Sequence, residues 1–73
     1  MKTRYTYRTR AGLFSIVLKP ADGMWHAMFE DEALGPYRTA QQAAEAIAGG
    51  ETYWPSCGDP SRFSLPDEIA DWS

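Results

Sequence analysis

The side chains that could form a nucleophile and its base are Cys57, the only cysteine, and His26, the only histidine. A thiol enzyme also needs a group that orients the base, and Asp59 is the acid closest in sequence to Cys57. However, His26 falls inside an alternating apolar segment, whereas Cys57 belongs to "SCGDPS", whose composition is typical of turns. We therefore expect no enzymatic activity, with thiol chemistry at Cys57 kept as an option.

A metal site could draw on the consecutive acids Glu30, Asp31 and Glu32, with His26 as a further ligand. Successive side chains point in different directions along the backbone, and the spacing matches neither an EF-hand nor a zinc site. The glycines are scattered and do not form a phosphate-binding run before a helix. The sequence therefore predicts a solvated acidic turn, no metal site and no cofactor.

Basic residues are concentrated at the start of the chain, although the net charge is −3. Nucleic acid could be bound by a basic first strand that carries Arg4, Arg8 and Arg10, with Lys19 beside it. The acids that dominate the rest of the chain oppose phosphate binding. Nucleic-acid binding is the alternative functional hypothesis, and pairing of these cations with the acidic part of the chain is a further interpretation.

Alternating apolar and polar residues predict the elements that position these groups. The expected strands are "TRYTYRT" (3–9), "LFSIVLK" (13–19) and "MWHAMFE" (24–30), separated by turn-forming residues. In the third strand Met24, His26 and Met28 share one face, opposite the aromatic residues. We expect a three-stranded antiparallel meander within residues 3–30, with residues 31–36 breaking the last strand.

A helix over residues 39–48 is predicted by "LGPYRTAQQAAEAIAGG". Thr39 and Gln42 have the spacing of a capping box, the apolar positions form one alanine-rich stripe, and Gly49-Gly50 provides a stop. Such a short helix needs tertiary packing to be stable. We expect it to lie across one face of the sheet.

Residues 51–73 have no long period but contain several aromatic residues, which predicts an ordered arm wrapped on the domain. The arm is expected to end in a short helix, with Ser64 as its N-cap and Pro66 in its first turn. The whole chain is then one α+β domain, because 73 residues provide only one core.

The stretch "GMWHAMFEDEALGPYRTAQQAAEAI" resembles AP2-type and phage-integrase arm-binding domains, in which a sheet precedes "G-x-F/Y-x-T-x-x-x-A-A" and a helix. That resemblance implies a sheet-plus-helix fold that reads DNA with basic and aromatic residues of the sheet. Here the matching strand and turn carry Met24, His26 and Met28, followed by the three acids, which argues against DNA binding.

The longer combination of "LGPYRTAQQAAEAIAGG", "YWPSCGDPS" and "LPDEIADW" resembles a group of small bacterial proteins of unassigned function. This resemblance implies a bacterial cytoplasmic protein. The single cysteine, the lack of a signal-like start and the short apolar runs lead to the same expectation of a cytoplasmic protein without membrane association.

The leading functional hypothesis is a small non-catalytic module that binds another protein or itself, since the apolar content exceeds what one short helix can cover. The candidate contact residues are Met24, His26 and Met28 on the sheet, and Trp54, Pro55 and Cys57 in the arm. The alternative is that the arm packs on that face of the sheet.

Overall fold

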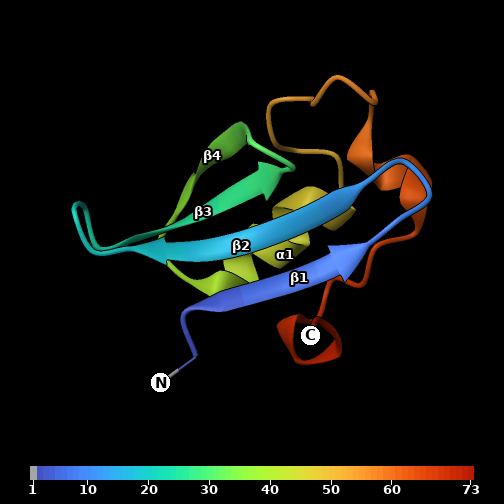
Figure 1. Cartoon of the computed structure of the whole chain (residues 1–73). Coiled ribbons are helices and arrows are strands. Elements are labelled where there is room, and N and C mark those ends of the chain that lie inside the picture. Colours follow the sequence, from blue (N-terminus) through green and yellow to red (C-terminus); the bar gives the residue numbers. More distant parts are fainter. Residues whose placement is uncertain (1) are drawn as a thin grey trace.

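The alternating segments form an antiparallel meander in the computed structural model, which describes residues 2–73. Its strands are β1 (Arg4–Arg8), β2 (Leu13–Lys19), β3 (Met24–Phe29) and β4 (Glu32–Tyr37), in the order β1-β2-β3-β4. The helix α1 (Ala40–Ala48) lies across one face of the sheet (Figure 1). The α+β class is confirmed, but the sheet has four strands and not three.

The fourth strand occupies residues that were expected to break the sheet. Glu30 adopts a left-handed conformation with φ 52°, which turns the chain back within two residues, and its amide donates to the Leu13 carbonyl. A register shift between β3 and β4 accommodates Leu34, which is almost fully buried. Pro36 is tolerated because β4 is an edge strand.

The core lies between α1 and the sheet. The sheet contributes large side chains, and α1 contributes mainly alanines. The buried members of this core are Phe14, Ile16, Ala27, Phe29 and Leu34 from the strands and Ala40, Ala43, Ala44 and Ile47 from α1. Small side chains let the helix approach the sheet closely, so the aromatic rings fill the space between them.

Both ends of α1 follow the sequence prediction. Thr39 is the N-cap and its hydroxyl accepts from the amide of Gln42 at 3.0 Å. At the other end Gly50 has φ 71°, its amide donates to Ile47, and the amide of Glu51 donates to Ala46. These two bonds form a Schellman motif that satisfies the last carbonyls of the helix.

The C-terminal arm is ordered and contains two short 3-10 helices, η1 (Pro60–Phe63) and η2 (Ile69–Asp71). Leu65 and Trp72 are buried, and the backbone of Ser73 pairs with Thr6 of β1 through two hydrogen bonds. The prediction that Ser64 caps the final helix was wrong. Ser64 instead ends η1 in a left-handed conformation, and η2 follows Glu68.

Two glycines with similar φ provide a matched test of the contact between α1 and the arm. Gly23→Ala, at a position surrounded by open space, should lower the free energy of unfolding by about 1 kcal/mol through backbone strain. In Gly50→Ala the new methyl group would also overlap the carboxylate of Asp59, so we expect a further loss of at least about 1 kcal/mol. Urea unfolding measures the free energy of unfolding of both variants. If the two variants lose the same free energy, the contact between Gly50 and Asp59 is not tight.

Candidate binding surface on the uncovered sheet face

Strand alternation assigns a second set of side chains to the sheet face opposite α1. Two rows run across the strands on this face: Arg4, Val17, His26 and Pro36 in one, and Thr6, Ser15, Met28 and Ala33 in the other. We call these eight residues, together with Arg8, Lys19 and Met24 at the strand ends, the open face. Met24, His26 and Met28, predicted from the sequence, therefore lie on one surface.

The arm does not cover the open face. The ring of Phe63 packs against Phe14 and that of Trp72 against Tyr7 in tilted pairs, with centroids 6.0 and 5.8 Å apart. Phe14 belongs to the core beneath α1 and Tyr7 packs against that core, so the arm lies on the helix side of the sheet. The alternative that the arm packs on the face of Met24, His26 and Met28 was therefore wrong.

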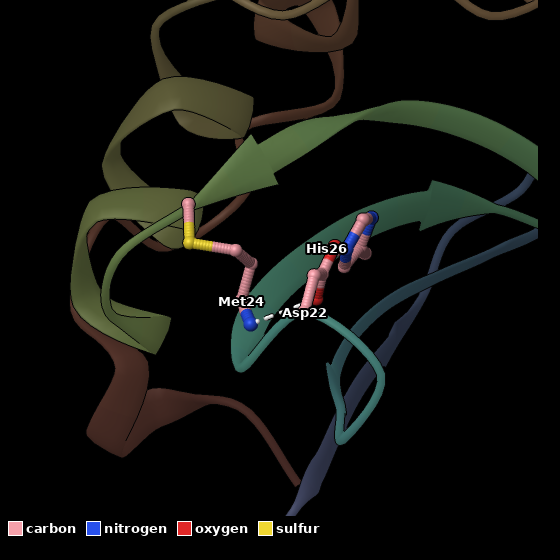
Figure 2. Close-up of polar contacts among 3 residues, drawn as sticks. All are labelled: Asp22, Met24 and His26. Atoms are coloured by element: carbon pink, nitrogen blue, oxygen red, sulfur yellow. Dashed lines mark hydrogen bonds and ion pairs between the residues drawn. The ribbon is translucent and has the colours of Figure 1, made fainter.

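His26 is held on the open face by the turn between β2 and β3. Its Nε2 lies 2.7 Å from Oδ2 of Asp22, and Oδ1 of Asp22 accepts from the amide of Met24 at 2.9 Å (Figure 2). Two hydrogen bonds hold the pKa of Asp22 below its ordinary value. The bond from the Met24 amide has the larger effect, and the bond to His26 has the second largest. The carboxylate thus fixes the orientation of the only imidazole on this surface.

The arginines of β1 are exposed and have no ion-pair partner. Within residues 2–73 the His26 and Asp22 contact is the only pair of opposite charges at ion-pair distance. Arg4 and Arg8 lie four residues apart on the same face, which separates them by about 13 Å along the strand. The interpretation that basic and acidic parts of the chain pair with each other was wrong for these side chains.

The other predicted basic residues are divided between two locations. Lys19 is exposed at the end of β2. It lies two residues after Val17, so both side chains point to the same side of the strand and Lys19 belongs to the open face. The guanidinium of Arg10 instead lies 5.0 Å from the centroid of the Phe63 ring, on the helix side. The structure therefore places Arg4, Arg8 and Lys19 on the same face, spread along its length, and places Arg10 on the other side.

The candidate residues of the arm are not part of the open face. Trp54 is 62% exposed, and its indole N–H donates to the Gly50 carbonyl at 3.0 Å. Pro55 is buried, and Cys57 is partly buried against the core. The amide and hydroxyl of Ser56 donate to the carboxylate of Glu32, which fastens this segment to the edge of β4.

The surroundings of Cys57 do not favour a nucleophile. Burial raises the pKa of its thiol, and the charge of Glu32 adds to this effect. His26 lies on the opposite face of the sheet from the core that Cys57 contacts. The structure therefore does not bring the proposed nucleophile and base together.

Among residues 2–73 there is no cluster of three or more His, Cys, Asp or Glu side chains that could hold a metal ion. In the same part of the chain, no helix has the length and apolar character required to cross a membrane.

Val17 and Ser15 belong to the open face, although the sequence analysis named neither as a candidate contact residue. The signal is their alternation with Phe14 and Ile16, which points them away from the core.

No protein-family model, curated protein or solved structure matches the chain.

The bonds to Asp22 predict a pH dependence with a definite sign. A lowered pKa means that the ionised carboxylate stabilises the fold above the unfolded-state pKa, and that this contribution is lost as the pH falls through the folded-state pKa. A carbon-detected NMR titration should give Asp22 a midpoint below 3.8, its ordinary value. In His26→Ala the midpoint should rise only part of the way, because the Met24 amide still donates to Asp22. A midpoint at or above 3.8 in the unaltered protein would contradict these contacts.

Proposed function

We propose that the protein is a small non-catalytic binding module that binds a negatively charged segment of another protein on its open face. The observation that carries the proposal is the combination of an uncovered sheet face with exposed Arg4 and Arg8 that have no ion-pair partner within residues 2–73. Two guanidinium groups on one strand can each make bidentate bonds to a carboxylate.

The centre of the open face supports a protein as the partner. Val17, Met24 and Met28 are half-buried apolar side chains between the charged positions. Methionine is flexible and polarizable, so it adapts to the side chains of a partner. An apolar centre with a charged rim is the usual arrangement of a protein interface.

The charges on the strands favour a different protein over a second copy of this chain. On the open face the strands carry Arg4, Arg8 and Lys19, and the carboxylate of Asp22 beside them is already bonded to His26 and to the Met24 amide. Two copies packed face to face would therefore bring more cations together than free counter-charges, which disfavours the pairing. An acidic partner supplies the missing charge.

A cytoplasmic location in a bacterium is also proposed for this protein. It rests on the resemblance of the helix and arm segments to small bacterial proteins, and on the single cysteine, which excludes an intrachain disulfide.

Charge reversal on β1 tests the function directly. The double variant Arg4→Glu/Arg8→Glu should weaken binding of the partner by at least about tenfold, because each replaced guanidinium becomes a repulsive carboxylate. Arg62→Glu, an exposed arginine of η1, is the control with the same chemical change outside the open face. Partners are isolated with the tagged protein from cells that produce it, and their affinities are then measured by calorimetry.

The expected result is a specific partner that the unaltered protein and Arg62→Glu bind equally and that the double variant loses. The proposal is contradicted if every protein captured binds the double variant as tightly as the unaltered chain. A reversible dimer in sedimentation that the double variant abolishes would show that the occupant is a second copy.

Nucleic-acid binding is the second candidate function, because Arg4, Arg8 and Lys19 lie unpaired on one surface within the described chain. The position of the aromatic residues disfavours it. Tyr5, Tyr7 and Trp25 pack against the core, so the open face has no ring other than His26 on which a base could stack.

Fluorescence anisotropy with a labelled single-stranded oligonucleotide separates the two candidates. Three phosphate contacts predict that log K falls with log salt concentration with a slope of roughly −2. If the protein binds nucleic acid, the oligonucleotide should bind at low salt, its affinity should fall with salt at that slope, and Arg4→Glu/Arg8→Glu should not bind it. An anisotropy that does not change at low salt would eliminate it.

A further inference from the structure

A cavity of about 290 Å³ lies at the β4 edge of the sheet, where Pro36 is the one lining residue that also belongs to the open face. It is formed by residues 34–37 of β4 and residues 51–53, the segment that follows α1. The amide of Tyr53 donates to the carbonyl of Leu34 at 3.2 Å, which holds the two segments together. Its volume is at the lower end of the range for ligand pockets, which suits a group the size of one side chain.

Aromatic rings form much of the boundary of this cavity. The ring of Tyr37 packs beside Gly35, and Tyr37 is partly buried against the core. Tyr53 is 78% exposed, and the neighbouring Trp54 is 62% exposed. Tyrosine and tryptophan are enriched at interfaces, because their rings are apolar and their O–H or N–H can still reach water.

The charge of the cavity comes from a single group, the carboxylate of Glu51. No cation of residues 2–73 lies within ion-pair distance of it. Burial, and secondarily the charge of Glu51, raises the pKa of Tyr37, so its hydroxyl stays protonated beside the carboxylate. The lining contains no basic side chain that could bind an anion.

We propose that this cavity binds an organic cation, a guanidinium or alkylammonium group on a hydrocarbon stem. The cation would neutralise Glu51 and lie against the tyrosine rings, whose faces attract positive charge. Pro36, which is exposed, provides apolar surface for the stem. The proposal is independent of the proposed function, since no residue of the β1 arginine pair lines the cavity.

The first test uses agmatine, a four-carbon stem with a guanidinium at one end and an ammonium at the other, titrated into the isotopically labelled full chain and followed by amide NMR. We expect saturable shifts centred on Gly35, Tyr37, Thr52 and Tyr53 and on the Trp54 indole. N-butylurea, a neutral analogue with the same stem length and no amine, should bind at least about fivefold more weakly. Equal binding of the neutral analogue, or no saturable shift with agmatine, would overturn the proposal.

Variants identify the groups responsible. Glu51→Gln should weaken agmatine binding by about fivefold, whereas Glu68→Gln, the same change at an exposed position before η2, should leave it unaltered. Tyr53→Phe should retain affinity and Tyr53→Ala should lose it, because the ring face and not the hydroxyl contacts the cation. If Glu51→Gln and Glu68→Gln bind agmatine equally, the proposal fails.

Comparison of agmatine with N-acetyl-arginine amide identifies the source of the cation. Tighter binding of the capped arginine indicates a protein side chain, and tighter binding of agmatine indicates a free amine. Both results support the cavity as a cation site. The variant Arg4→Glu/Arg8→Glu should bind both probes as tightly as the unaltered protein does. A negative result for cation binding in the cavity therefore leaves the proposal for the open face untouched, and the reverse also holds.

Discussion

The close approach of α1 to one face of the sheet is the contact on which the rest of the structure depends. Ala43 and Ala44 are fully buried, so the helix axis comes near the strands and the rings of Phe14 and Phe29 fill the remaining space. A nine-residue helix covers only one face of a four-stranded sheet. The arm adds Phe63 and Trp72 to that same side, which leaves the opposite face without a covering element in the described chain.

This asymmetry gives the two sides of the sheet different surfaces. The helix side holds the core and, at its margin, the tyrosine and Glu51 cavity. The open face holds exposed arginines, methionines and an imidazole oriented by Asp22. The chain has a net charge of −3, and yet the open face carries arginines, Arg4 and Arg8, that no acid of residues 2–73 pairs with. At long range the net charge of −3 attracts a positively charged partner, whereas at contact Arg4 and Arg8 attract a negatively charged one.

Local patterns were sufficient to predict some elements and insufficient for others. Thr39 and Gly50 marked the ends of α1 correctly, because capping depends on neighbouring residues alone. β4 escaped prediction because Glu30 takes a left-handed turn without glycine, and because Pro36 is compatible only with an edge position. The side on which the arm packs, and the cavity beside residues 51–53, depend on contacts between distant segments that no local period encodes.

The exposure of the two sheet faces can be measured directly by NMR with a soluble paramagnetic gadolinium complex. Strong broadening is expected for the methyl signals of Met24 and Met28, and little for those of Ile16 and Ile47, which are fully buried between the sheet and α1. Val17 provides a second reporter on the open face. If the Met28 and Val17 methyl groups were protected as well as that of Ile16, the face would be covered, and the central claim of an open binding surface would be contradicted.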